Sequence, residues 1–169
     1  NGQSPPIAIL PRNLDHFLIS QIDGPVIAGT PVTITLQAVT TTHDLVKSFV
    51  GTVNLSVSTG EGTVSPIILG PFDEGAWSGE IVFTKAANDV SISVDDGATP
   101  VHSGLSNPFI VTPGSFEKLQ VLLPGEHPQP GLIPGKIGSP TYQQTGSQFE
   151  VIVRAVDNYW NLVSQTDDS

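Results

Sequence analysis

The sequence contains no cysteine and no methionine. Without cysteine there is no disulfide framework and no metal site built on thiolates. Charged residues are also scarce, at 13% of the 169 residues, which is about half of their usual share in a globular protein. No apolar run approaches the roughly 20 residues of a membrane-spanning helix, so we expect no membrane insertion.

Cationic residues are few, because six Lys and Arg stand against 16 Asp and Glu and give a net charge of −10. A surface of this sign repels phosphate backbones and anionic lipids, so we expect no nucleic-acid partner. The sequence shows no secretion signal. Because it begins at Asn1 rather than at Met, we expect a processed chain or a piece of a longer one.

Glycine, proline and alternating apolar residues dominate what the sequence does contain. The 17 Gly and 15 Pro argue against long helices. Apolar residues fall on every second position of several short stretches, as a strand with one buried face requires. These stretches are Phe17–Ile22, Val32–Val39, Gly51–Val57, Trp77–Phe83, Val90–Val94 and Pro108–Thr112. Turn-forming residues separate them, and we therefore predict an all-β chain.

An internal repeat divides the chain. The stretch Gly29–Val46 aligns without a gap with Gly146–Val163, and the strand-like stretches before them, His16–Ser20 and Lys118–Leu123, also match. The identical pairs are Gly29/Gly146, Ala38/Ala155, Val39/Val156, Leu45/Leu162 and Val46/Val163. A Pro-Gly break within Thr112–Ser115 separates the two copies.

These boundaries predict an N-terminal extension over residues 1–13, a first domain over 14–114 and a second over 115–169. The first has about the length and the number of strand-like stretches of an immunoglobulin-like β-sandwich, which has about 100 residues and seven strands. The second holds only the opening strands. We therefore predict one complete immunoglobulin-like copy followed by a partial second copy.

Half of a sandwich cannot bury both faces of its core, and three explanations of the partial copy remain open. The chain could be truncated from a longer parent. A neighbouring molecule could complete the copy by adding a strand, for which Pro5–Pro11 is a candidate donor. The opening strands could instead extend the first domain.

Three stretches resemble the bacterial immunoglobulin-like repeats of large secreted and cell-surface proteins: Ala28–Ser56, Gly75–Gly97 and Ser106–Gly114. The second copy, through Gly146–Val163, is similar to a further repeat of that kind. The resemblance implies a non-enzymatic extracellular or cell-surface module, such as a stalk, an adhesin arm or a surface-layer component. It also implies adjacent immunoglobulin-like domains or neighbouring subunits as partners, with a surface polysaccharide as a further candidate.

Catalytic motifs are absent from the sequence. The four His residues have no metal-binding spacing, and there is neither a G-x-S-x-G elbow nor a Gly-rich phosphate loop. Ser115–Lys118 matches S-x-x-K but enters a strand rather than lying on a helix. The acidic pairs Asp73/Glu74 and Asp95/Asp96 lie in turns, where Asp commonly bonds to the backbone. We therefore expect no enzyme and no organic cofactor.

The stretch Val156–Val163, "VDNYWNLV", holds the strongest candidate site. Asp157, Asn158 and Asn161 supply oxygens for a calcium ion, or else close a turn through their side chains. Tyr159 and Trp160 could contact carbohydrate or a partner, or pack against the end of the sandwich. A separate candidate is Asn54, which heads an N-glycosylation triplet and should point outward between Val53 and Leu55.

Overall fold

The computed structural model describes residues 13–164, and these form 14 β-strands and no helix. The first ten strands are β1 (His16–Ile19), β2 (Val26–Ile27), β3 (Pro31–Val39), β4 (Val53–Thr59), β5 (Val64–Ser65), β6 (Ile68–Leu69), β7 (Ala76–Phe83), β8 (Ala87–Asp95), β9 (Ser103–Leu105) and β10 (Phe109–Thr112). The last four are β11 (Lys118–Leu122), β12 (Glu126–Pro128), β13 (Lys136–Gly138) and β14 (Ile152–Val156). Within the described residues there is accordingly no helix suited to crossing a membrane.

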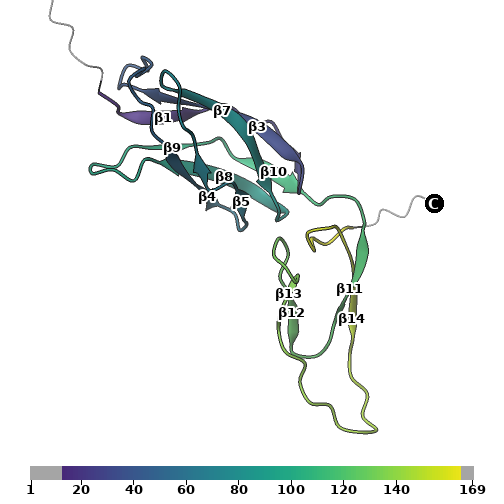
Figure 1. Ribbon diagram of the computed structural model, residues 1–169. Helices are drawn as coiled ribbons and strands as arrows, with labels where there is room; N and C mark the ends of the chain where they lie inside the picture. Colours follow the sequence, from purple (N-terminus) through teal and green to yellow (C-terminus); the bar gives the residue numbers. More distant parts are fainter. Residues whose placement is uncertain (1–12, 165–169) are drawn as a thin grey trace, which may run out of the picture.

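Strands β1 to β10 form a two-layer β-sandwich over residues 14–112, called the sandwich below (Figure 1). One sheet has the order β1-β3-β7-β5, and the other has β2-β10-β8-β4-β6 with β9 beside β8. The side chains that alternate inward from both sheets form one buried core, which includes Ile34, Leu36, Leu55, Ile81 and Ile92. The predicted all-β sandwich class is confirmed.

Strand β3 owes its length to partners on both sides. Its last four residues pair with β1, from Leu36 opposite Ile19 to Val39 opposite His16. Its first residues pair with β7 alone, from Pro31 opposite Val82 onward. All nine residues of β3 are therefore paired only by the two neighbours together.

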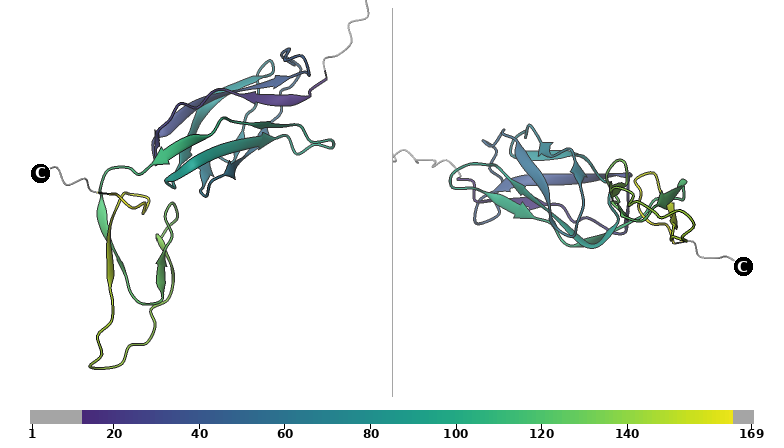
Figure 2. Two further views of the ribbon diagram at one scale, coloured as in Figure 1. Left: turned by 180° about the vertical axis from the view of Figure 1, so that it is seen from behind. Right: turned by 90° about the horizontal axis from the view of Figure 1, so that it is seen from below.

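The remaining strands lie in residues 115–164, called the C-terminal segment, which extends from one end of the sandwich (Figures 1 and 2). Here β11 pairs with β14, and β12 pairs with β13. Neither pair joins a sheet of the sandwich. The opening strands of the second copy therefore do not extend a sheet of the sandwich. The candidate donor strand Pro5–Pro11 lies outside the described residues.

The aligned stretches adopt the same local geometry. His16 pairs with Val39 in the sandwich, and Lys118 pairs with Val156 in the C-terminal segment. After β3 and after β14 the chain turns back. An isolated bridge then joins Val39 to Leu45 in the sandwich and Val156 to Leu162 in the C-terminal segment. The matching hydrogen bonds, Val46 N to Ala38 O and Val163 N to Ala155 O, measure 2.8 and 2.9 Å.

Strand β14 is shorter than β3 because no strand takes the place of β7. It begins at Ile152, which corresponds to Thr35, whereas β3 begins four residues earlier at Pro31. The apolar face that forms the core in the sandwich is also open. Val151 and Val153 are 42% and 58% exposed, although their counterparts Ile34 and Leu36 are 1% and 0% exposed.

The long connection between β11 and β14 contains a hairpin, β12–β13, that alternation in the sequence did not predict. It lies against the other face of β11, where Gln120 and Leu122 are each 2% exposed. The Gln120 side chain donates from Nε2 to the Gly135 carbonyl at 2.7 Å and accepts from Arg154 at 3.2 Å. The connection thus covers the face opposite to the apolar one.

Candidate functional site

The five residues 157–161 close a tight turn around the Asp157 carboxylate. Oδ1 of Asp157 accepts from the backbone N–H of Tyr159 at 2.8 Å and of Asn161 at 2.9 Å. Trp160 has a φ of 68°, in the left-handed region. The side chain of Asp157 therefore takes the role of a backbone acceptor, as Asx turns do.

The corresponding turn in the sandwich, residues 40–44, has the same shape with a different side chain at its centre. Oγ1 of Thr40 accepts from the N–H of Thr42 and of Asp44, each at 3.2 Å. His43, in the place of Trp160, has a φ of 62°. One oxygen of Asp157 thus does what the single hydroxyl of Thr40 does.

The second oxygen of Asp157 binds the linker instead. Oδ2 accepts from the backbone N–H of Gly114 at 2.8 Å and from Nδ2 of Asn161 at 2.8 Å. Asp157 and Asn161 are each 1% exposed. A buried carboxylate needs such donors, because burial without them is strongly unfavourable.

Asn161 joins the turn to the β7–β8 loop of the sandwich. Its Nδ2 donates to the Thr84 carbonyl at 2.9 Å, and its Oδ1 accepts from the Ala86 N–H at 2.8 Å. Both ends of the amide are therefore used, which fixes its orientation. The same loop meets the C-terminal segment again where Oγ1 of Thr84 donates to the Gly131 carbonyl at 2.8 Å.

Tyr159 fills the remaining space at this contact. Its ring lies against Gly29, which has a φ of 83°, and a Cβ on Gly29 would lie 2.2 Å from Tyr159 Cε2. The Tyr159 carbonyl accepts from the Gly131 N–H at 2.7 Å. We call this whole contact, formed by Gly29, Thr84, Ala86 and Gly114 on one side and residues 131 and 157–161 on the other, the joint.

Trp160 packs against other residues of the C-terminal segment. The Lys118 ammonium lies 3.9 Å from its ring centroid and donates to the Asn158 carbonyl at 2.9 Å. The ring also lies against Gly135, where a Cβ would come within 2.1 Å of Cγ. Beside these aromatics is a cavity of about 240 Å³, lined by Lys118, Gly131, Leu132, Ile133, Asn158, Tyr159 and Trp160.

The residues predicted for calcium do lie together, but their oxygens are engaged. Both Asp157 oxygens and the Asn161 oxygen accept hydrogen bonds, and the Asn158 carbonyl accepts from Lys118. Among residues 13–164 there is no group of three or more His, Cys, Asp or Glu arranged to hold a metal. Calcium at this turn stays a prediction, and the ion would have to displace these donors.

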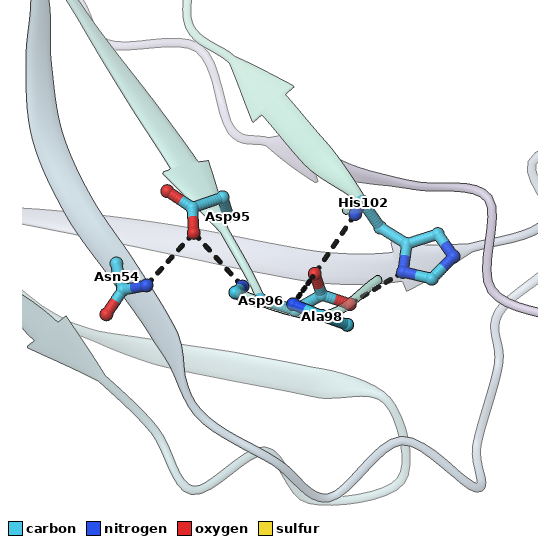
Figure 3. Close-up of polar contacts among 6 residues, drawn as sticks. Asn54, Asp95, Asp96, Ala98 and His102 are labelled. Atoms are coloured by element: carbon cyan, nitrogen blue, oxygen red, sulfur yellow. Dashed lines mark hydrogen bonds and ion pairs between the residues drawn. The ribbon is translucent and has the colours of Figure 1, made fainter. Parts of the chain in front are cut away.

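The second acidic cluster lies at the β8–β9 turn (Figure 3). Oδ1 of Asp95 accepts from Asn54 Nδ2 at 2.9 Å and from the Gly97 N–H at 3.0 Å. Oδ2 of Asp96 lies 2.6 Å from His102 Nδ1, and its Oδ1 accepts from the N–H groups of Ala98 and His102. These bonds match the interpretation of the acidic pair as a turn.

The environment of Asp96 shifts its titration. Burial acts to raise the pKa of the Asp96 carboxyl, whose side chain is 8% exposed. Hydrogen bonds from the His102 ring and from the backbone of His102 and Ala98 outweigh burial and hold this pKa below its ordinary value of 3.8. The carboxylate is therefore fixed in its charged form as part of the turn.

Asn54 is exposed on β4 between buried Val53 and Leu55, as the alternation predicts. Its Nδ2, the atom to which a glycan would be attached, is hydrogen-bonded to Asp95. Trp77 is half-buried and packs at the margin of the core, with its ring over Gly79. Glycosylation of Asn54 stays a prediction.

The sequence revealed one side of the joint only. The turn was found through the repeat, but Gly29, Thr84 and Ala86 are contacts from distant parts of the chain. The available signal was the exchange of residue types between "TTTHD" and "DNYWN". An Asp and an Asn in place of Thr40 and Asp44 supply the additional acceptor and the amide that reach the sandwich.

The fold defines this protein as an all-β protein with a two-sheet sandwich. No family model and no curated protein matches the sequence. The resemblance to bacterial immunoglobulin-like repeats therefore rests on the quoted residues alone and stays a prediction. Among solved structures, the crystal structure of the S-layer protein rSbsC(31-844) is similar at a TM-score of 0.41 and 14% identity, over 92% of this chain and 18% of that chain. A likeness at this level does not establish a shared activity.

Proposed function

We propose that the chain is a non-enzymatic structural module of a secreted or cell-surface multidomain protein. In this proposal the sandwich is one immunoglobulin-like unit, and the C-terminal segment supplies the opening strands of a second. The joint sets the angle between them. Stalks, adhesin arms and surface-layer components all need such units, because they must hold their ends apart at a defined separation.

The observation that carries the proposal is the burial of Asp157 and Asn161 between the two parts. A flexible linker would leave polar side chains in water. Here each side chain is almost fully buried and is hydrogen-bonded to the linker or the sandwich. Because a buried polar group loses stability when its partners move away, these bonds favour one orientation of the parts.

Distance measurements between two spin labels test the proposal. The chain has no cysteine, so Glu80→Cys on β7 and Leu119→Cys on β11 would carry the only labels. We expect a narrow distance distribution that broadens in Asn161→Ala. The matched control is Asp44→Ala, the same position of turn 40–44, which should leave the distribution narrow. A broad distribution in the unchanged joint would contradict the proposal.

A second function is favoured by the cavity beside Tyr159 and Trp160. Aromatic rings next to polar groups suit a sugar ring, so a carbohydrate-binding accessory module is the alternative. Both aromatics are half-buried, and Trp160 contacts Lys118 on its ring. Binding to a polysaccharide or glycan array that is lost in Trp160→Ala, with the label distances unchanged, would support this function instead.

A further inference from the structure

Strand β14 pairs with β11 on one side, and among the described residues no strand pairs with its other edge. In the sandwich, Thr35 bonds to Ser20 on the β1 side, and Ala38 N donates to the Gly75 carbonyl on the β7 side. By the alternation of a strand, Val151, Val153 and Ala155 direct their backbone groups to the corresponding free side. Of these, the Ala155 carbonyl is taken by Val163 N.

Over Glu150–Val153 this edge lacks the lysine and proline that often prevent pairing with another chain. Natural edges are kept short, charged with Lys or interrupted by Pro. The edge strands β5 and β6 of the sandwich follow that pattern, since each has two residues and is followed closely by Pro66 or Pro71. The stretch from Glu150 to Val153 is exposed and contains neither Lys nor Pro.

The sequence of the edge is complementary to itself. Glu150–Arg154 reads E-V-I-V-R. In an antiparallel pair of two such stretches centred on Ile152, Glu150 lies opposite Arg154 of the second copy, and Val151 lies opposite Val153. The backbone N–H and C=O groups of Val151 in one copy then form hydrogen bonds with those of Val153 in the other copy. Glu150 and Arg154 fall on non-hydrogen-bonded pairs, where opposed side chains are closest.

We propose that this protein self-associates through β14, with a second copy of the chain in the place that β7 occupies beside β3. The two-fold axis passes through Ile152, and the product is a four-stranded sheet with the order β11-β14-β14-β11. Arg154 already donates to Gln120 at 3.2 Å, and its guanidinium has further donors free to bond a carboxylate. This inference goes beyond the structural-module proposal and does not depend on the joint.

Disulfide trapping tests the register directly, because the chain has no cysteine of its own. Ile152→Cys places two thiols on the axis, where Cα atoms of a non-hydrogen-bonded pair lie about 4.5 Å apart, within the range that a disulfide spans. We expect covalent dimer under mild oxidation. The matched control is Leu119→Cys, which is exposed on β11 of the same sheet and should remain monomeric.

Charge reversal tests the same register without a covalent bond. Glu150→Arg and Arg154→Glu should each weaken the dimer by at least tenfold in sedimentation equilibrium, and an equimolar mixture of the two should recover it. Glu80→Arg, an exposed reversal on β7, is the control for net charge and should not alter association. Circular dichroism of each variant separates lost pairing from lost folding.

Three results would overturn the proposal. One is a wild-type chain that stays monomeric up to about 1 mM. Another is crosslinking of Leu119→Cys that equals or exceeds that of Ile152→Cys. Leu119 lies on the open apolar face with Val153, and Ile152 lies on the opposite face with Leu122, so such crosslinks would come from packing of apolar faces or from unspecific collision and not from pairing of the β14 edges. The third is a dimer that both charge reversals leave intact, because Glu150 and Arg154 would then not lie opposite each other across the axis.

Discussion

Asn161 donates from Nδ2 to Oδ2 of Asp157 at 2.8 Å, and both side chains are 1% exposed. Both residues belong to turn 157–161, and they connect it to the linker and to the β7–β8 loop. They therefore donate or accept most of the hydrogen bonds of the joint. Each remaining polar atom of the pair bonds to a backbone group. The pair is therefore the point at which changes to the joint should be largest.

Asp157→Ala should lower the free energy of unfolding of the C-terminal segment by about 3 kcal/mol, because it leaves the buried N–H of Asn161 and the part-buried N–H groups of Tyr159 and Gly114 without an acceptor. Urea unfolding followed by the fluorescence of Trp160, in a Trp77→Phe background, measures this. Thr40→Ala is the matched control, followed by the fluorescence of Trp77 in a Trp160→Phe background, since the corresponding hydrogen bonds of the sandwich are exposed. Equal losses in both variants would contradict the role of burial.

Gly29→Ala should disrupt the joint through two separate effects. The new Cβ meets the Tyr159 ring at 2.2 Å, and the φ of 83° is unfavourable for alanine. Tyr159→Ala removes only the first effect. A double-mutant cycle should therefore give a coupling of about 1–3 kcal/mol between the two positions. Strictly additive losses in unfolding free energy would mean that the ring does not rest on Gly29 in solution.

Acid should destabilise the sandwich through Asp96. Because its pKa in the folded chain lies below the ordinary 3.8, the ionised carboxyl stabilises the folded state above that pH, and the contribution is lost as the pH falls below it. The unfolding free energy of Asp96→Asn should decline less steeply over this range, as chemical denaturation at a series of pH values would measure. An unchanged slope would exclude Asp96 as a source of acid sensitivity.

Calcium should leave the melting temperature of chelator-treated protein unchanged, because an ion at Asp157 would have to displace the hydrogen bonds that close the turn and bind Gly114. Differential scanning calorimetry during a calcium titration measures this. A rise in melting temperature that is abolished by Asn158→Ala would instead support the calcium site predicted from the sequence.

The sequence allowed the principal strands of the sandwich to be predicted because their alternation is a local property. Val32–Val39 and Trp77–Phe83 each fall within an observed strand, β3 and β7. The hairpin β12–β13 was missed because its three-residue strands contain two apolar positions at most, too few to show a period. Turn 157–161 was located by the identical residues on either side of it, Val39/Val156 and Leu45/Leu162. Because the two turns have the same length between matching residues, they adopt the same shape.

The contacts of that turn could not be predicted in the same way. Thr84 and Ala86 lie more than 70 residues from Asn161 along the chain, and nothing in their own sequence marks them as partners. They contribute through backbone groups, whose availability depends on how the β7–β8 loop is folded. The exposure of Val151 and Val153 could not be predicted from these residues either. Their counterparts Ile34 and Leu36 are buried by a second sheet, and among the described residues no such sheet covers β14.

The two oxygens of Asp157 divide their tasks, and this division has an evolutionary consequence. Oδ1 of Asp157 accepts the hydrogen bonds that shape the turn, as the Thr40 hydroxyl does in the sandwich. Oδ2 of Asp157 and the Asn161 side chain attach the turn to the linker and to the sandwich. A descendant chain could therefore lose or acquire a stiff connection by exchanging one or two side chains, without any insertion and without refolding a strand. Modules built on this turn would vary in flexibility independently of their shape.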